Sequence, residues 1–486
     1  MKLPKFDALE EPLIFERSSS GKKAVDLPPL DVPEKEFDKS LLREELPDFP
    51  EVSEVEIIRH FSRLSQLNYS VDTGFYPLGS CTMKYSPKIN EKISMSESFT
   101  KAHPYLPEYM VQGNLEIIKK LEQYLSEITG MDYFSLSPAA GAHGELTGML
   151  IIRAYHNKKK ERRTKVLIPD SAHGTNPSSA HIAGFEVEEI PSDSRGTVDT
   201  LAFEKIVDEN VAALMLTNPN TLGIFEDEIL KISEILHSKG AILYMDGANL
   251  NALLGISKPG KMGVDVLHLN LHKTFSTPHG GGGPGSGPVG VKKELEEFLP
   301  VPLIEKSEKG YYFYYDRPNS IGRVRTFYGN FLVLVKTLAY ILSLGPKGLK
   351  EVAEIAVLNS NYIRKKLETI YTVPYSTPTL HECVLSHNFN QTKGVRTLDI
   401  AKRLIDYGIH PPTIYFPLIV NEALMVEPTE TEGKRDLDNF INAMIEIAKE
   451  IEENSEILKN APSKSPVARL DETSAARRPK LVWKKE

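Results

Sequence analysis

The sequence predicts an α/β protein in which a large, mostly parallel sheet domain is followed by a smaller C-terminal α+β domain. Between residues 131 and 292, short apolar runs alternate with stretches of helical periodicity. Strands and helices that alternate in this way form a parallel sheet covered by helices on both faces. After residue 346 the pattern changes to longer helices separated by short strands, which indicates a second compact domain.

Length and composition limit the classes of protein to consider. A chain of 486 residues with 41% hydrophobic content is long enough for two domains with additional arms. The net charge of −8 argues against a nucleic-acid-binding protein, which needs a basic face. No uncharged run reaches transmembrane length, and the first residues lack the apolar segment of a signal peptide. We therefore expect a cytoplasmic protein with no membrane or nucleic-acid partner.

Cysteines and histidines predict neither a disulfide framework nor a metal centre. Cys81 and Cys383 are the only two cysteines, as expected in a reducing compartment, although a bridge between them remains open. The histidines show none of the spacings typical of zinc sites. The role of Cys81 in any redox control is not decided by its sequence context.

The chain divides into four predicted segments. Residues 1–75 form an arm and a helix, 76–330 the large domain, 331–460 the small domain and 461–486 a tail. Proline and charge dominate the first 50 residues, so this arm either wraps a partner subunit or is disordered. Trp483 either anchors the tail on a neighbour or belongs to a loose end.

Periodicity and capping residues predict the elements in order. A helix is expected over 51–67, and a second over 115–128 is closed by Gly130. The sheet domain is expected to contain strands at 133–136, 165–168, 185–190, 211–216, 241–245, 264–269 and 288–291, with helices at 144–156, 176–183, 201–209 and 228–239. An apolar helix over 331–344, ending before Gly345, joins the domains. The small domain is expected to contain helices at 350–370, 397–406 and 435–454 and strands near Val384 and Leu424.

A lysine and an aspartate at the ends of two apolar strands indicate the chemistry. Lys273 follows the strand at 264–269, and Asp246 ends the strand at 241–245. A desolvated lysine can hold an aldehyde as a Schiff base, and a carboxylate can keep a pyridine nitrogen protonated. Both are requirements of pyridoxal phosphate. Asp170 and Asn218 also follow strands, so all four can meet at one sheet edge.

The alternative is that Lys273 is a solvated loop lysine and that the glycines at 280–283 form a flexible linker. On the functional interpretation, those glycines let the backbone approach a bulky planar ligand. They fit neither a phosphate-binding Walker A motif nor a dinucleotide fingerprint. The loop at 77–84, PLGSCTMK, combines turn residues with a thiol and a lysine, so it serves either a site or a packed connection.

Small residues between a strand and a helix predict where the phosphate binds. Ala140, Gly141 and Ala142 lie at a helix N-terminus, where free N–H groups and the helix dipole favour an anion. His143 comes next and could lie flat on the pyridine ring. A histidine that only begins the helix is the alternative.

Five motifs together resemble the P-protein of the glycine cleavage system, in particular its second subunit where the enzyme is split. They are SPAAGAHGE (137–145), DSAHGTNP (170–177), TNPNTLG (217–223), YMDGAN (244–249) and LNLHKTF (269–275). The resemblance extends from the loop at 77–84 to the tail at 469–483. It implies a fold-type-I pyridoxal-phosphate architecture.

The resemblance also implies roles for individual residues. Lys273 resembles the Schiff-base lysine, Asp246 the pyridinium partner and His143 the ring-stacking histidine, while Ala140, Gly141 and Ala142 resemble the phosphate turn. Further cofactor-pocket residues would be His173, Thr175, Asn218, Asn220, His272 and Thr326. His272 could equally be a packed residue. Arg323, Arg325 and Thr326 could bind a substrate carboxylate or a phosphate, with surface ion pairs as the alternative for the arginines.

The function implied is that of glycine dehydrogenase (aminomethyl-transferring, decarboxylating), an oxidoreductase. Such an enzyme releases CO2 from glycine and transfers the aminomethyl group to the lipoyl arm of the H-protein. The family further implies a cofactor-less subunit 1 and an α2β2 heterotetramer. Two alternatives remain: another pyridoxal-phosphate amino-acid decarboxylase or one-carbon enzyme, and a non-catalytic scaffold subunit. Intact Asp246 and Lys273 argue against the scaffold.

Overall fold

The structure, a computed structural model, describes residues 11–45, 47–278, 285–387, 394–465 and 467–482. The chain divides into two compact units, Met1–Thr73 with Lys464–Glu486, and Gly74–Ser463. The glycines at 280–283 and Trp483, both singled out in the sequence, lie outside the described residues.

The unit Gly74–Ser463 contains the sheets and most of the helices. Its strands are β1 (Tyr133–Ser135), β2 (Lys165–Pro169), β3 (Glu186–Ile190), β4 (Val211–Thr217), β5 (Ile242–Gly247), β6 (Val266–Leu269), β7 (Val289–Val291), β8 (Leu303–Ser307), β9 (Gly310–Tyr314), β10 (Cys383–Leu385), β11 (Thr413–Ile414) and β12 (Leu424–Val426). Its helices are α2 (Lys88–Ser94), α3 (Glu97–Thr100), α4 (Gln112–Thr129), α5 (Gly141–Lys158), α6 (Thr175–Ile182), α7 (Thr200–Ile206), α8 (Ile229–Ser238), α9 (Leu271–Thr274), α10 (Phe331–Leu367), α12 (Thr397–Asp406), α13 (Lys434–Asn454) and α14 (Glu456–Lys459).

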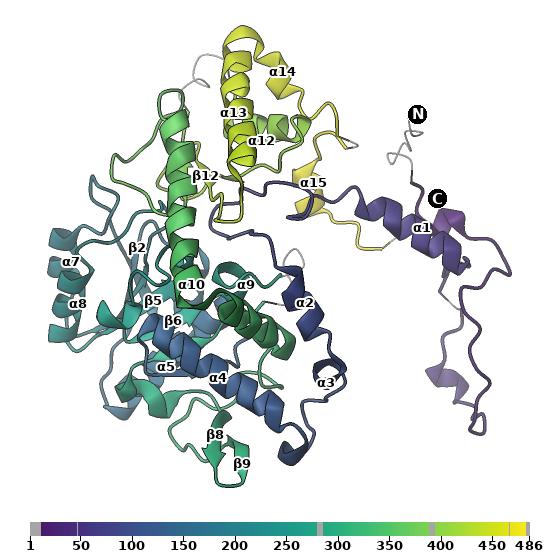
Figure 1. Cartoon of the computed structure of the whole chain (residues 1–486), viewed down its shortest axis with the longest axis horizontal. Helices are drawn as coiled ribbons and strands as arrows, with labels where there is room; N and C mark the ends of the chain where they lie inside the picture. The colour runs from purple at the N-terminus through teal and green to yellow at the C-terminus, as the bar shows by residue number, and fades with distance from the viewer. Residues whose placement is uncertain (1–10, 46, 279–284, 388–393, 466, 483–486) are drawn as a thin grey trace. The chain divides into compact units, whose positions relative to one another are not determined.

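A seven-stranded sheet in the order β1-β7-β6-β5-β4-β2-β3 forms the centre of this unit (Figure 1). The pairs β3–β2, β2–β4, β4–β5 and β5–β6 are parallel. Only β7 runs against its neighbours β1 and β6. The predicted α/β class with a mostly parallel sheet is confirmed.

Alternation along the strands divides the core between the two faces of the sheet. In β4, Leu214 and Leu216 join the cluster that includes residues of α4, α7, α8 and α10, whereas Ala213 and Met215 join the cluster of α5 and α6. Every residue of β4 is buried. Because successive side chains of a strand point to opposite faces, a strand covered on both sides must be apolar throughout.

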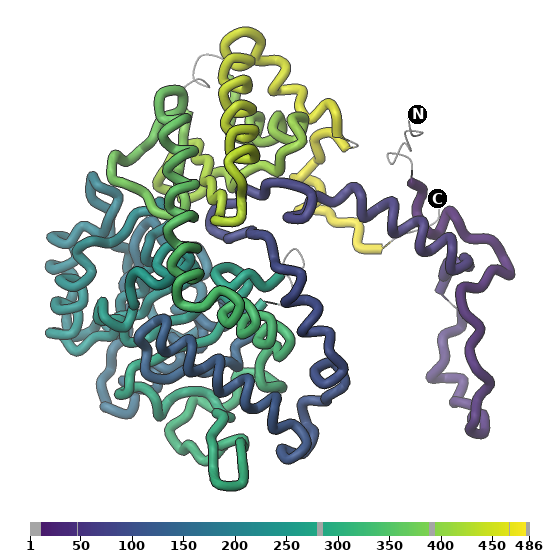
Figure 2. Tube along the Cα trace, in the orientation of Figure 1, coloured from purple at the N-terminus to yellow at the C-terminus, as the bar shows by residue number. Residues whose placement is uncertain are grey.

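The long helix α10 connects the sheet to the C-terminal part of the same unit. Its first half packs on the sheet through Val333 and Leu334, and its second half packs through Ile363 and Leu367 against a separate cluster that includes α12 and α13. The trace in Figure 2 follows this path. The backbone leaves the helical conformation at Gly345, with φ 61° and ψ −177°, where the sequence predicts the helix to end.

By length and composition, α10 is the one described helix that could cross a membrane, a test that core helices of water-soluble proteins also pass. Its apolar residues have a structural explanation, because many of them pack into the two core clusters.

The second sheet is small, with β12 between β10 and β11 in antiparallel pairing. The loop at 77–84 adds to it, because Leu78 forms an isolated bridge with Val426 and Gly79 donates its N–H to the Met425 carbonyl at 3.2 Å. A Cβ on Gly79 would lie 2.1 Å from the Met425 side chain. The close approach of loop and strand therefore requires glycine. The hairpin β8–β9 was not predicted.

The unit Met1–Thr73 with Lys464–Glu486 contains α1 (Glu54–Ser65) and α15 (Glu472–Arg477) among its described residues. Ser53 and Glu56 form a capping box at the start of α1. The buried Glu11 carboxylate contacts His60 at 2.8 Å and Arg63 at 3.1 Å. Between residues 18 and 45 nearly every side chain is exposed.

We expect Leu214→Ala in β4 to lower the free energy of unfolding by about 2–5 kcal/mol, because the truncation leaves a cavity in a packed core. Leu230→Ala on α8 is the matched control, since Leu230 is 59% exposed and its loss should change stability by less than about 0.5 kcal/mol. Denaturant unfolding followed by circular dichroism measures both. Equal effects of the two substitutions would contradict this assignment of the core.

Candidate active site

The site is built where two neighbouring parallel strands end. Asp246 lies near the end of β5, and β6 leads through Asn270 into the short helix α9, which carries Lys273. In the register of the pair, Asp246 lies opposite His268. The carboxyl ends of parallel strands share one edge of the sheet, so Asp246 and Lys273 belong to the same edge.

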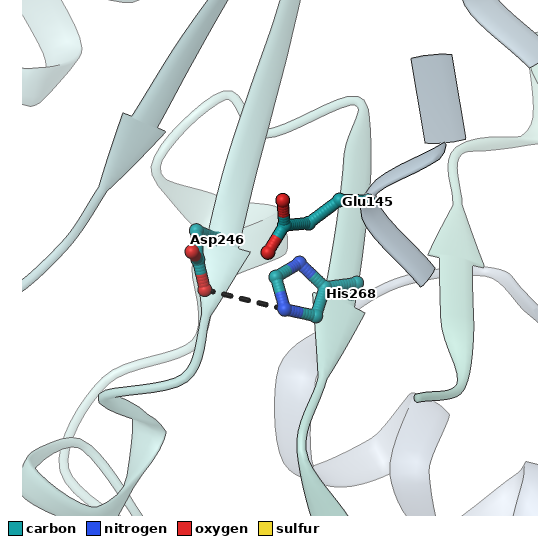
Figure 3. Close-up of side chains that lie close together, drawn as sticks. All are labelled: Glu145, Asp246 and His268. Atoms are coloured by element: carbon teal, nitrogen blue, oxygen red, sulfur yellow. Dashed lines mark ion pairs between the residues drawn. The ribbon is translucent and has the colours of Figure 1, made fainter. Parts of the chain in front are cut away.

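Asp246 is a buried carboxylate held by several donors. It is 3% exposed, and its Oδ1 accepts the Ala248 N–H at 2.9 Å. His268 Nε2 lies 3.3 Å from the same oxygen (Figure 3), and the Asn176 amide lies 3.3 Å from Oδ2. A buried carboxylate needs such partners, because its desolvation is otherwise expensive.

His268 links Asp246 to Tyr244. Its Nδ1 lies 2.6 Å from the Tyr244 hydroxyl, and the ring is fully buried. Burial lowers the pKa of His268, more than the nearby Asp246 raises it, so the ring is neutral at physiological pH. Because a carboxylate only accepts, the proton lies on Nε2 and Nδ1 accepts from the tyrosine. The chain Tyr244–His268–Asp246 thereby fixes the orientation of the carboxylate.

Glu145 faces the same cluster from α5 (Figure 3). It accepts hydrogen bonds from Thr175 Oγ1 at 2.8 Å and Ser179 Oγ at 3.1 Å. Burial, and next the charge of Asp246, raise the pKa of Glu145 to about 7. Ligand atoms of Glu145, Asp246 and His268 lie within 4.8 Å of one another, a spacing that could also hold a metal ion. All three side chains already have hydrogen-bond partners within the protein, and we interpret the cluster as part of a cofactor site.

Lys273 is half-buried, and its Nζ donates to the carbonyl oxygen of Ser80 at 2.7 Å. Ser80 has a φ of 62°, which is uncommon for a residue other than glycine. The positive charge of Lys273 acts on the pKa values of Glu145, His173, Glu382 and Glu427. Lys273 therefore lies among titratable groups from α5, from the start of α6 and from the ends of β10 and β12.

His173 and Thr175 lie at the start of α6 beside this cluster. His173 Nδ1 is 2.8 Å from Thr175 Oγ1, and Thr175 reaches Glu145. Burial lowers the pKa of His173, and Lys273 lowers it further. The structure therefore brings these two residues together with Asp246 and Lys273, as the motif predicts for a common pocket.

His143 lies in the first turn of α5. Its Nδ1 accepts the Ala139 N–H at 3.1 Å. Burial, and then the charge of Arg325, lower the pKa of His143, so the ring is neutral. Arg325 itself donates to Asn330 Oδ1 at 2.9 Å. An arginine near the N-terminus of an 18-residue helix adds a positive charge where the first N–H groups already favour an anion.

The glycines around this turn allow backbone segments to pack closely. A Cβ on Gly141 would lie 2.4 Å from Asn270 Oδ1, and one on Gly287 would lie 2.0 Å from the Ala140 carbonyl. Ala140 and Ala142 themselves are exposed. His272 packs on the same segment, because its Nδ1 accepts the Ser286 N–H at 3.3 Å. Its proposed contact with the cofactor stays a prediction.

The remaining predicted site residues make their described contacts with groups other than Asp246 and Lys273. The Asn220 amide donates to the Gly196 carbonyl and to Glu226. Its oxygen accepts two backbone N–H groups of its own loop, so these hydrogen bonds stabilise that loop. Asn218 Oδ1 accepts the Glu226 N–H. Thr326 is exposed and its carbonyl accepts the Tyr105 hydroxyl, while Arg323 lies over the Tyr315 ring. None of these contacts tests their assignment as cofactor or substrate residues.

Sequence reasoning missed three groups that the structure brings near Lys273. They are Glu145, His268 and the pair Glu382 and Glu427. A signal was present for the pair, because Glu382 directly precedes β10 and Glu427 directly follows β12. What could not be predicted is the pairing of these two short strands.

Buried polar atoms around Lys273 support a polar ligand there. Among the described residues, Asn270 Oδ1, Thr274 Oγ1, Thr277 Oγ1 and Ser286 Oγ are buried without a hydrogen-bond partner. At the end of β4, Thr217 Oγ1 and Asn218 Nδ2 are also buried without a hydrogen-bond partner. Unpaired buried polar groups are rare in proteins. An amine, a carboxylate, a helix N-terminus and unused hydroxyls fit a phosphorylated pyridine aldehyde.

Comparison with known sequences identifies the family. Residues 25–311 match the model described as glycine cleavage system P-protein, and residues 352–467 match the model for the C-terminal domain of glycine dehydrogenase. The chain belongs to the glycine cleavage system P-protein family. It is 60% identical over 478 residues to a probable glycine dehydrogenase (decarboxylating) subunit 2 of Caldanaerobacter subterraneus subsp. tengcongensis, covering 97% of this chain and 99% of the relative.

A second P-protein relative is the probable glycine dehydrogenase (decarboxylating) subunit 2 of Listeria monocytogenes serotype 4a. It is 57% identical over 485 residues, covering 98% of this chain and 99% of the relative. The resemblance given by the five motifs is thus confirmed.

Solved structures support the fold. The structure of a glycine decarboxylase (P-protein) in inhibitor-bound form superimposes with a TM-score of 0.70 at 22% identity, covering 86% of this chain and 92% of that one. A sphingosine-1-phosphate lyase of Burkholderia pseudomallei gives a TM-score of 0.63 at 14% identity, covering 86% and 94%. The fold-type-I architecture expected from the motifs is confirmed.

The raised pKa of Glu145 predicts a pH-dependent stability. Its folded pKa of about 7 exceeds its ordinary value, so the stability contributed below about pH 4 is lost as the pH rises through about 7. Glu145→Gln carries no titrating proton, and we expect its thermal midpoint to fall less between about pH 5 and about pH 8.

The cofactor-free chain is suited to this measurement, with Glu204→Gln as control because Glu204 is exposed on α7. The control should follow the parent protein at both pH values. An identical fall for Glu145→Gln and the parent protein would contradict the assignment of a protonated Glu145.

Proposed function

We propose that this chain is the pyridoxal-phosphate-binding subunit of a split glycine dehydrogenase (decarboxylating), which releases CO2 from glycine. Two nearly full-length relatives with 60% and 57% identity have names that state this activity. The observation that carries the proposal is structural: Asp246 and Lys273 meet at one edge of the sheet, at the ends of neighbouring parallel strands.

Each predicted site residue would have a separate role in binding the cofactor. Lys273 would hold the cofactor aldehyde through its amine, and the phosphate would bind at the start of α5, near Arg325. His143, neutral and half-buried, would lie against the pyridine ring. Asp246 would hold a proton on the ring nitrogen, oriented by His268 and Tyr244. When bound, pyridoxal phosphate supplies an electron-withdrawing ring that accepts the electron pair left by the departing carboxylate.

Burial increases the effect of Asp246. The carboxylate and its partner His268 are shielded from water, so the charge on Asp246 acts through a low dielectric. A positive ring nitrogen is therefore stabilised more strongly than it would be at the surface. A pocket that partly excludes water would also favour loss of the substrate carboxylate, because a neutral product needs less solvation than an anion.

The transfer step and the assembly belong to the same proposal. We propose that the aminomethyl group passes to the lipoyl arm of the H-protein, and that subunit 1 completes an α2β2 heterotetramer. The designation of the relatives as subunit 2 supports a partner chain. Cys81 and Cys383 are not joined in a disulfide, which supports the cytoplasmic location that we propose.

Borohydride trapping tests the assignment of the site. We expect the purified chain with added pyridoxal phosphate to gain a visible absorption band. After reduction, the cofactor mass should lie on the peptide that contains Lys273. Lys84 is the internal control, because it is also a buried lysine but is engaged by Glu430 at 2.7 Å. Cofactor mass found on Lys84 or on another lysine would contradict the assignment of Lys273 as the lysine that binds the cofactor.

Asp246→Asn should lower the rate of glycine-dependent CO2 exchange by about a hundredfold or more. Removing one member of a buried charge pair costs about 3 kcal/mol, which is about two decades in rate. The exchange is measured with subunit 1 and lipoylated H-protein present. Asp265→Asn is the control, because Asp265 pairs with His237 just before the start of β6, at the opposite end from Lys273. Equal losses in both variants would indicate a folding defect instead.

A further inference from the structure

Two buried glutamates from the small sheet form a carboxyl pair close to Lys273. Glu382 directly precedes β10, and Glu427 directly follows β12. These strands are antiparallel neighbours with Cys383 opposite Val426, so the register continues to Glu382 opposite Glu427. Both glutamates are 0% exposed.

The hydrogen bonds of the pair come mainly from the loop at 77–84. Glu382 Oε2 accepts the Ser80 N–H at 3.0 Å, and Glu427 Oε1 accepts the Thr82 hydroxyl. Asn249 reaches the other oxygen of Glu382 at 3.4 Å. Among the described residues, Glu427 Oε2 has no hydrogen-bond partner although it is buried. The pair therefore has one oxygen available for a proton or a ligand.

One ligand atom of each glutamate lies within 4.8 Å of one on the other, and two carboxylates so close in a buried site disfavour each other's charge. Burial raises the pKa of Glu382 to about 7. Burial, and next the charge of Glu382, raise the pKa of Glu427 well above its usual range. The raised pKa values favour a protonated carboxyl in this pair near neutrality and leave the other able to take up a proton.

Positive charge near the pair partly opposes the rise in its pKa values. Lys273 lowers the pKa of both glutamates, and Lys84 lowers that of Glu427. Cys81 also faces this region, since its pKa responds to Lys273 and to Glu427. His381 Nε2 lies 4.0 Å from Glu382, and burial lowers its pKa to about 3, so it is a neutral group.

Ser80 joins the pair to the lysine. Its carbonyl accepts from Lys273 Nζ at 2.7 Å, and its N–H donates to Glu382 at 3.0 Å. The other acidic groups near Lys273 have hydrogen-bond partners of their own. Asp246 is held by His268 and Ala248, and Glu145 accepts from Thr175 and Ser179.

We propose that the Glu382–Glu427 pair accepts the proton that the substrate amino group must lose when it enters at Lys273. This inference rests on the proposed function. An amino acid arrives as an ammonium ion, which has no lone pair and cannot attack an aldehyde carbon. In the step, one ammonium N–H bond breaks and one carboxyl O–H bond forms on the pair. Nothing is oxidised or reduced.

Two amines that differ in protonation distinguish this role from a general loss of function. Glycine is an ammonium ion at neutral pH and needs the proton acceptor. O-Methylhydroxylamine is uncharged at neutral pH and needs none. Each is mixed with the cofactor-loaded chain in the presence of subunit 1, and the change in visible absorption is followed by stopped flow.

We expect Glu382→Gln and Glu427→Gln to slow the reaction with glycine by about a hundredfold, the usual size of a proton-transfer contribution. The reaction with O-methylhydroxylamine should keep its rate. Glu122→Gln is the matched control, since Glu122 on α4 is a buried glutamate with a pKa raised to about 7 but no interaction with Lys273 among its causes. Equal slowing of both amines, or of neither, would overturn the proposal.

Infrared difference spectra of the cofactor-free chain provide a readout independent of catalysis. The parent protein should show the carbonyl stretch of a protonated buried carboxyl at neutral pH, and Glu427→Gln should remove one such band. An unchanged spectrum would overturn the assignment of a protonated carboxyl to this pair. A stoichiometric metal ion in the purified chain, lost in both glutamine variants, would also overturn it and assign His381, Glu382 and Glu427 to a metal site.

If a glutamine variant fails to load with cofactor, Thr82→Val keeps both carboxyls and removes one hydrogen bond to Glu427. That hydrogen bond favours the ionised form, so its loss should shift the pH midpoint of the glycine reaction upward and leave the O-methylhydroxylamine profile in place. An unshifted midpoint would overturn the proposal. A parent protein that reacts with neither amine would instead contradict the proposed function.

Discussion

A carboxylate buried at the end of a central strand is the constraint on which the rest of the site depends. Asp246 is 3% exposed, and its charge is tolerated because Ala248, Asn176 and His268 supply hydrogen bonds. Those donors come from the following turn, from α6 and from the adjacent strand β6. Asp246 thus depends on the parallel pairing of β5 with β6, which supplies His268. The same pairing places the end of β6, and with it the helix that carries Lys273, at the same edge of the sheet.

The sequence predicts well the features that depend on local order along the chain. Every strand and helix expected between residues 131 and 292 is present, because apolar periodicity and glycine caps are local signals. Asp246 and Lys273 could be placed at one edge of the sheet because both follow or end parallel strands, whose carboxyl ends share that edge. The family was identified from five short motifs, and the comparisons confirm it.

Features that depend on distant pairing could not be predicted. Glu382 and Glu427 meet only because β10 and β12 are antiparallel, and strands of three residues carry almost no register information. The sequence also cannot show that the Asn220 amide donates to the Gly196 carbonyl, or that Glu145 reaches the strand-end cluster from α5. In each case the deciding contact is made by a side chain whose partner is remote in the sequence.

The loop at 77–84 has a mechanical consequence. The Gly79 N–H of this loop donates a hydrogen bond to the Met425 carbonyl in β12. The Ser80 carbonyl accepts a hydrogen bond from Lys273 Nζ. Ser80 is held in a left-handed conformation between these two attachments. A displacement of the small sheet would therefore be transmitted directly to the lysine amine as a change in its hydrogen bond. The small sheet and the lysine are therefore mechanically coupled through Ser80.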